Sequence, residues 1–171
     1  MKRLSLLVVL LALAGCESLN KGPSAEARLE AAKGGKVAGR VTFHEVDGKT
    51  LIRAEVNGLP GNRQFGFHVH DKGDCSAPDF MSAGGHFNPE SKPHGDHQKP
   101  ESHAGDLPNL SSNGEGTAVL SYTTTVLTVA PGPRSVAGRA VVVHENPDDY
   151  RSQPAGNSGP RIACGVVRAS S

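Results

Sequence analysis

Short runs of β-forming residues, interrupted throughout by glycine and proline, constrain the fold of this chain more than any other feature. The chain has 21 Gly and 12 Pro among 171 residues, and no stretch after residue 36 has an apolar period of 3.6 residues. Six runs rich in Val, Ile, Thr and Leu have the pattern of strands: 37–45, 50–56, 64–70, 117–127, 137–145 and 162–167. The pattern predicts an all-β sandwich or barrel, and the composition excludes a coiled coil and a polytopic membrane protein.

Two long segments, residues 75–115 and 146–160, lack any strand pattern. A loop of about forty residues in a compact domain needs a function or a ligand to order it. Four of the eight His lie in the longer segment, between His86 and His103. We therefore expect both segments to be functional loops, and we expect a metal to order the longer one.

The N-terminal residues have the pattern of an export signal. Lys2 and Arg3 precede an almost uninterrupted apolar run at 4–14. As a helix this run would span only about 16 Å, well short of the roughly 30 Å hydrocarbon core, so a signal peptide over residues 1–15 is favoured over a membrane span.

The four residues 13–16, Leu-Ala-Gly-Cys, resemble a bacterial lipobox, whose cysteine is lipidated and becomes the new N-terminus. Glu17 is compatible with sorting to the outer membrane. The alternative is an ordinary secretory peptide in which Cys16 is incidental. Residues 17–34 are polar and rich in Ala, so 16–35 is expected to be a lipidated Cys16 followed by a flexible tether, with the domain at 36–171. The expected location is the periplasm or cell envelope, with the lipid anchored in the outer membrane.

Charge and cysteine content agree with an exported domain. The formal charge of +1 has both signs interspersed, so nothing indicates a nucleic-acid partner. If Cys16 carries lipid, Cys75 and Cys164 remain as a pair in an oxidising compartment. Two free buried thiols are the alternative.

Four histidines have the positions of a first metal group. His68 and His70 are two residues apart on a predicted strand, so their side chains share a face. Alone, such a pair is often decorative or part of a cupin iron site. His144 ends a second strand, and His86 follows a glycine pair, so the four imidazoles could form one site suited to Cu(II).

The longer loop supplies a second group: His86, His94, His103 and Asp106. Three imidazoles and one carboxylate make a closed tetrahedral shell, which suits structural zinc. His86 belongs to both groups because a deprotonated imidazole can bind one metal through each nitrogen. The alternative is a polar loop whose histidines are solvated.

Six short motifs, in this order, resemble the copper/zinc superoxide dismutase family of the exported bacterial type. They are Gly-Phe-His-Val-His at 66–70, Gly-Asp-Cys at 73–75, Gly-Gly-His-Phe-Asn-Pro at 84–89, His-Ala-Gly-Asp-Leu at 103–107, Val-Val-His-Glu at 142–145, and Gly-Asn-Ser-Gly-Pro-Arg-Ile-Ala-Cys-Gly at 156–165. The resemblance covers residues 36–168. It implies a Greek-key β-sandwich or flattened barrel of about eight antiparallel strands. It also implies disproportionation of superoxide to oxygen and hydrogen peroxide by Cu(II)/Cu(I) cycling.

The resemblance also implies a role for each candidate residue. It implies copper on His68, His70, His86 and His144, zinc on His86, His94, His103 and Asp106, and a disulfide between Cys75 and Cys164. Arg161 would dock superoxide beside the copper, and His86 would release copper on reduction and take up a proton. Asp148, rather than its neighbour Asp149, would join His68 to His94.

Some features fall outside the family pattern. His44 and His97 match no ligand position, and both are expected at the surface. The segment after Cys75, residues 76–83, is short, and both a monomer and a homodimer stay open.

Two other classes of function would use part of the same pattern. A non-enzymatic periplasmic copper/zinc-binding protein would need the ligands but not Arg161. A cupin dioxygenase would need a Glu a few residues after the His68 and His70 pair, where this chain has Asp74. The presence of both Arg161 and Asp148 favours the enzyme.

Overall fold

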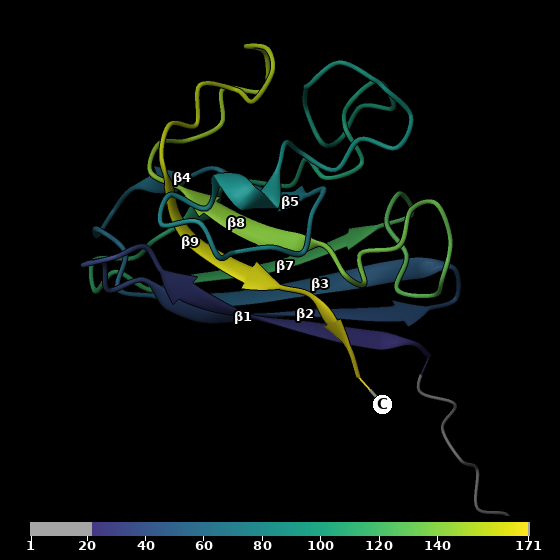
Figure 1. Cartoon of the computed structure of the whole chain (residues 1–171), viewed down its shortest axis with the longest axis horizontal. Helices are drawn as coiled ribbons and strands as arrows, with labels where there is room; N and C mark the ends of the chain where they lie inside the picture. The colour runs from purple at the N-terminus through teal and green to yellow at the C-terminus, as the bar shows by residue number, and fades with distance from the viewer. Residues whose placement is uncertain (1–21, 171) are drawn as a thin grey trace, which may run out of the picture.

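The computed structural model describes residues 22–170, which form an all-β domain (Figure 1). Its strands are β1 (Ser24–Ala31), β2 (Ala38–Val46), β3 (Lys49–Asn57), β4 (Gln64–Phe65), β5 (Phe67–His70), β6 (Leu110–Ser111), β7 (Ala118–Thr124), β8 (Ala140–His144), β9 (Arg161–Val166) and β10 (Arg168–Ala169). The only helical element in this part of the chain is the short 3₁₀ turn η1 (Met81–Ala83). No helix among the described residues has the length and apolarity needed to cross a membrane.

A single curled antiparallel sheet makes up most of the domain. Its strand order is β5-β8-β9-β1-β2-β3-β7, β10 also pairs with β1, and β4 and β6 form a separate pair. Alternation of side chains directs one face of each strand inward, as in β3, where Ile52, Ala54 and Val56 are buried. The core enclosed by the curl also contains Phe43 and Phe67. The predicted all-β sandwich or flattened barrel is confirmed.

The predicted tether is wrong for residues 24–31, which form β1 in the middle of the sheet. This strand pairs with β2 from Ser24 to Leu29 and with β9 at its last two residues. Its inward-facing side chains are Ala25, Ala27 and Leu29. Two of these are only methyl groups, so the alternation has a weak apolar signal in the sequence. The predicted signal peptide, Cys16 and the start of the tether lie outside the described residues.

Local geometry changes two other predicted segments. The run at 64–70 divides into β4 and β5 at Gly66, where a Cβ atom would lie 2.7 Å from the Ser158 side chain. The long segment 75–115 contains η1 and β6. In Figure 1 this segment, in teal, and the segment 146–160, in yellow-green, both lie above β8 and β9. The fold therefore brings the two long loops to one side of the sandwich.

Candidate metal centre

The first group of histidines lies where β5 and β8 pair. His68 and His70 come from β5, His144 ends β8, and His86 follows η1 and forms an isolated bridge with His70. Each ring offers a nitrogen, and these four nitrogens all lie within 4.8 Å of one another. The structure thus brings together the four residues that the sequence predicts as one group.

Two of these four nitrogens are buried without a hydrogen-bond partner, Nδ1 of His68 and Nε2 of His86. The other two, Nε2 of His70 and Nε2 of His144, are 3.3 Å apart. A buried polar atom without a partner is costly, and four converging imidazole nitrogens are a donor set suited to copper. The residues therefore fit a metal ion at this point.

The opposite nitrogen of each ring is held by a neighbour. Nδ1 of His70 donates to the Gly84 carbonyl and Nδ1 of His144 to the Gly159 carbonyl, both at 3.0 Å. Burial lowers the pKa of His68 to about 3 and that of His144 to about 4. Neutral imidazole is the form that binds metal, so the group is prepared for a ligand role at neutral pH.

The second group surrounds one oxygen of Asp106. Its Oδ1 lies 2.8 Å from Nδ1 of His86, 3.1 Å from Nδ1 of His94 and 3.3 Å from Nδ1 of His103. In a tetrahedral zinc site with bonds of about 2.0–2.1 Å, neighbouring ligand atoms are separated by about 3.3 Å. The observed separations match this shell, and His86 belongs to both groups through its two nitrogens.

The electrostatics of the second group favour a cation. Burial would raise the pKa of Asp106, but hydrogen bonds with His103, His86 and His94 hold it far below its usual range. Its other oxygen, Oδ2, accepts from the backbone amides of Gly95 and His103. Burial would lower the pKa of His94, but Asp106 and Asp148 raise it to about 9. The raised pKa favours the cationic form of His94 at neutral pH, and zinc binding there would release a proton.

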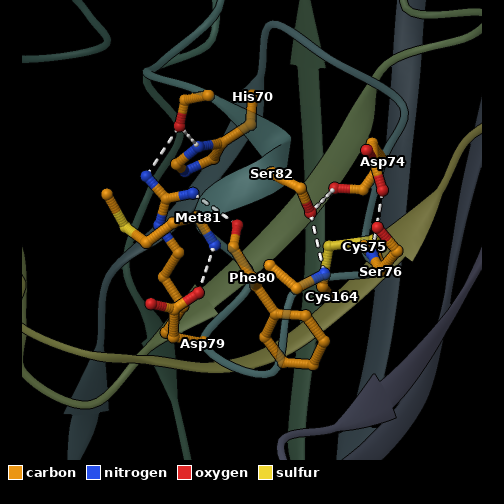
Figure 2. The surroundings of a disulfide bond; sticks show 12 residues. His70, Asp74, Cys75, Ser76, Asp79, Phe80, Met81, Ser82 and Cys164 are labelled. Atoms are coloured by element: carbon orange, nitrogen blue, oxygen red, sulfur yellow. Dashed lines mark hydrogen bonds between the residues drawn. A yellow bond between two sulfur atoms is a disulfide. The ribbon is translucent and has the colours of Figure 1, made fainter.

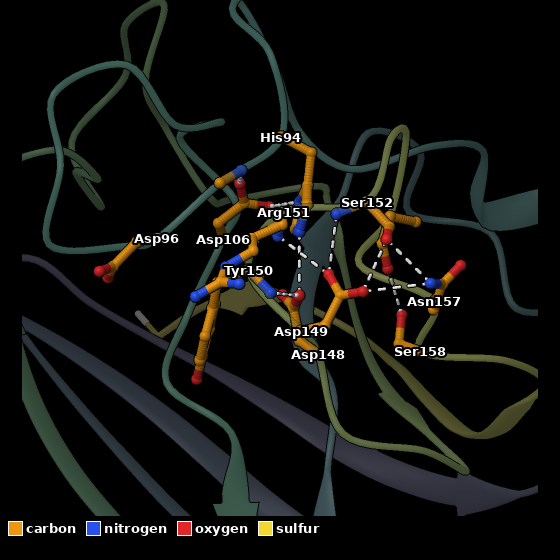
Figure 3. A network of polar contacts seen from close by, with 12 residues as sticks. His94, Asp96, Asp106, Asp148, Asp149, Tyr150, Arg151, Ser152, Asn157 and Ser158 are labelled. Atoms are coloured by element: carbon orange, nitrogen blue, oxygen red, sulfur yellow. Dashed lines mark hydrogen bonds and ion pairs between the residues drawn. The ribbon is translucent and has the colours of Figure 1, made fainter.

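Asp148 connects the two groups, as the sequence predicts. Its Oδ2 lies 2.8 Å from Nε2 of His68 and its Oδ1 lies 2.9 Å from Nε2 of His94. Asp149 instead contacts its own loop, accepting from Ser152 and Asn157 (Figure 3). Asp148 therefore fixes the orientation of one imidazole in each group.

Arg161, the first residue of β9, is fixed beside the first group. Its Nη1 donates to the Phe80 carbonyl and its Nη2 to the Gly84 carbonyl, both at 2.6 Å. Phe80 has a left-handed backbone (φ 59°) and packs against the Cys75–Cys164 disulfide, beside which its turn lies in Figure 2. Arg161 and His144 line the same open pocket of about 370 Å³.

Three backbone carbonyls, those of Phe80, Gly84 and Gly159, were not anticipated as parts of the site. Carbonyls have no residue signature, and the glycines at 84 and 85 are the only hint in the sequence. Gly156 begins the motif at 156–165, and a Cβ there would lie 1.7 Å from Oδ1 of Asp148, so only glycine fits beside this carboxylate. The short loop between Cys75 and His86 thus supplies two of the three carbonyls, those of Phe80 and Gly84.

The two remaining histidines differ from each other. His44 is exposed, as expected. His97 is not a surface residue, because its side chain is only 10 % exposed and its ring packs against Tyr122 and Tyr150. No pattern in the sequence predicts this contact, since the two tyrosines are distant in the chain.

The fold and the site define a class of protein: an antiparallel β-sandwich with two adjacent metal-binding groups that share one imidazole. The family model described as copper/zinc superoxide dismutase matches residues 37–167. The chain belongs to this copper/zinc superoxide dismutase family, with copper and zinc as its metals.

Relatives and solved structures agree with this assignment. Superoxide dismutase [Cu-Zn] 2 and [Cu-Zn] 1 of Aquifex aeolicus are both 41 % identical, over 78 % and 80 % of this chain and 81 % and 82 % of their own length. The superoxide dismutase-like protein YojM of Bacillus subtilis is 39 % identical over 78 % of this chain and 70 % of its own.

Two crystal structures resemble the domain as a whole. The clock protein EA4 has a TM-score of 0.78 at 37 % identity, covering 86 % of this chain and 95 % of its own. A double mutant of a superoxide dismutase-like protein from Bacillus subtilis has a TM-score of 0.75 at 38 % identity, covering 82 % and 95 %.

Proposed function

We propose that this protein is an active superoxide dismutase, with copper held by His68, His70, His86 and His144 and structural zinc held by His86, His94, His103 and Asp106. The observation that carries the proposal is that Nδ1 of His68 and Nε2 of His86 are buried without a hydrogen-bond partner. The same group is accessible, because His144 lines an open pocket together with Arg161. When bound, copper supplies one-electron cycling between Cu(II) and Cu(I), so that one superoxide is oxidised to oxygen and the next is reduced to hydrogen peroxide.

Arg161 attracts and orients the anion. Burial lowers the pKa of Arg161, but a guanidinium stays charged at neutral pH. Two of its nitrogens donate hydrogen bonds to backbone carbonyls, so the side chain is held in place before the substrate arrives. The remaining N–H groups can donate to superoxide in the pocket.

His86 takes up and then releases the proton that the reaction needs. Its Nδ1 faces Asp106 in the second group, so its free Nε2 is the atom that can take up a proton on the side of the first group. Burial lowers the pKa of His86, which favours passing that proton on to the reduced oxygen species. Asp106 keeps the ring oriented during this exchange.

The test compares superoxide consumption by the copper- and zinc-loaded protein with that of His144→Ala. The wild type should be active, and His144→Ala should lose about a hundredfold or more, since loss of even an outer partner of a ligand costs 10–100-fold. His44→Ala, an exposed histidine on β2, is the matched control and should keep full activity.

The alternative is a non-enzymatic periplasmic copper/zinc-binding protein, for which the relative named only superoxide dismutase-like is a reason to test. A wild type that binds one copper and one zinc but consumes no superoxide would support this alternative and contradict our proposal.

We also propose that the protein is exported and attached to the outer membrane by lipid on Cys16, facing the periplasm. The lipobox-like sequence supports this, as does the Cys75–Cys164 disulfide, since disulfides persist in oxidising compartments. The full-length protein should fractionate with membranes and carry the mass of a lipidated N-terminus, whereas Cys16→Ser should be released. A full-length protein with an unmodified mass would contradict the proposal.

A further inference from the structure

Arg139, the residue just before β8, contacts the chain directly after two of the proposed copper ligands. Its Nη1 donates to both the carbonyl and Oδ1 of Asp71, each at 2.6 Å. The centre of its guanidinium lies 4.0 Å from the ring centroid of Phe87. Asp71 follows His70 and Phe87 follows His86, so one side chain contacts both ligand-bearing segments.

The two segments already pair through their backbones. Asp71 N donates to the Gly85 carbonyl at 2.9 Å, and Phe87 N donates to the Val69 carbonyl at 2.8 Å. These bonds set the local register. Arg139 spans the same pair of segments through side-chain contacts, so its planar group restrains their separation from outside the backbone ladder.

The ion pair with Asp71 does not explain Arg139 as a source of general stability. The Arg139 side chain is 29 % exposed and that of Asp71 is 52 % exposed, and such ion pairs contribute little to folding. The contacts do fix geometry, because the charge-assisted hydrogen bonds from Nη1 to Asp71 and the cation–π contact with Phe87 both depend on the orientation of the guanidinium. Restraint from Arg139 would complement the contact that Asp106 makes with Nδ1 of His86 on the zinc side.

We propose that Arg139 is a positioning residue that holds His70 and His86 at the separation copper needs. Arg139 acts through Asp71 and Phe87 and touches neither metal nor substrate. The inference rests on the proposed function, because it assumes that copper occupies the first group.

The test measures copper(II) affinity by chelator competition and the copper(II) electron paramagnetic resonance spectrum of the zinc-loaded protein. Arg139→Gln should weaken copper binding by about tenfold, the lower end of the range for outer partners of ligands, and should change the copper hyperfine splitting. Arg139→Lys keeps the charge without the planar guanidinium, and its copper affinity should fall between those of the wild type and Arg139→Gln. Adding Asp71→Asn to Arg139→Gln should weaken copper binding little further, because both substitutions remove the same contact.

Arg40→Gln is the matched control, since Arg40 is an exposed arginine on β2 that pairs with Glu26 on β1. It should leave the affinity and the spectrum unchanged. Urea unfolding of the metal-free variants separates a stability effect from a positioning effect. If Arg139→Gln lowers stability but leaves copper affinity and spectrum as in the wild type, the positioning role is wrong. A wild type that fails to bind copper would instead contradict the proposed function.

Discussion

At the residue scale, each histidine of the first group directs one ring nitrogen to the proposed copper position, and a neighbour contacts the other nitrogen. Asp148, Asp106 and two glycine carbonyls supply those fixed contacts. The choice of nitrogen is therefore set by the protein before any metal arrives. Burial lowers the pKa of all four imidazoles, and the contact at one nitrogen of each ring keeps that ring in a defined orientation.

Replacing Arg161 with Ala should reduce the second-order rate of superoxide consumption several-fold or more. The variant should also lose most of the salt dependence of that rate, because the positive guide in the pocket is gone. Stopped-flow assays between about 0.01 and 0.15 M salt measure both effects. Arg161→Lys keeps a charge and should keep most of the salt dependence. Unchanged rate and salt response in a copper-loaded Arg161→Ala protein would exclude the guide role.

The side chains of the site could be predicted from the sequence, but several of their partners could not. Most ligand residues occur in the six motifs, whereas Asp148 lies outside them and only the family resemblance distinguishes it from Asp149. The Phe80 carbonyl and the burial of His97 depend on contacts between segments far apart in the chain. No residue type marks either of them in advance.

At the element scale, β1 is the largest difference from the sequence-based prediction. Strands with Val and Ile on their inner face, such as β3, could be recognised from alternation. In β1 the inner face has two alanines and one leucine, whereas its neighbour β2 buries the larger Val41 and Phe43. The strand is defined by its partners β2 and β9 rather than by its own composition.

A chain that starts at Lys33 should not fold cooperatively, because removal of β1 separates β2 from β9 and leaves both with unpaired edges. A chain that starts at Gly22 is the control and should unfold in one transition. Urea denaturation followed by circular dichroism distinguishes the two. Equal midpoints for both chains would mean that the sheet does not depend on β1.

The two long loops also meet in a way that their sequences do not reveal. Gln153 accepts from the backbone N–H of His94 and donates to the carbonyl of the same residue, both at 2.9 Å. These contacts join segments 59 residues apart. The loops were predicted to be functional from their lack of strand pattern, but their mutual contact required the fold.

At the scale of the whole molecule, the all-β class followed from alternation and turn residues, whereas the curl of the sheet depends on the packing of one face against another. Phe43 from β2 and Phe67 from β5 belong to the same buried cluster. This packing joins strands that are distant in the chain, so the sequence alone does not predict the curl of the sheet.

The metal-free domain should be most stable near pH 6.5–7. Below pH 6.5 the unfolded chain protonates histidines that the folded state keeps neutral, with folded pKa values of about 3 for His68 and about 4 for His144, so stability falls toward pH 4. His94 affects stability in the opposite direction, because folding raises its pKa. Its contribution is complete below pH 6.5 and is lost as pH rises through about 9. Urea unfolding across pH 4–10 measures the curve, and stability that rises on acidification from pH 6.5 to 4 would contradict it.

The direction of β1 has a consequence for the proposed membrane attachment. Ser24 pairs with His44 at one end of the strand, and Ala31 pairs with Ala163, close to Arg161, at the other. Seven residue steps separate these ends by about 23 Å. An anchored domain would therefore enter its fold at the end remote from the reactive pocket. At physiological salt that separation exceeds two screening lengths of about 8 Å, so the negative surface potential of a bilayer beneath the domain would scarcely repel incoming superoxide.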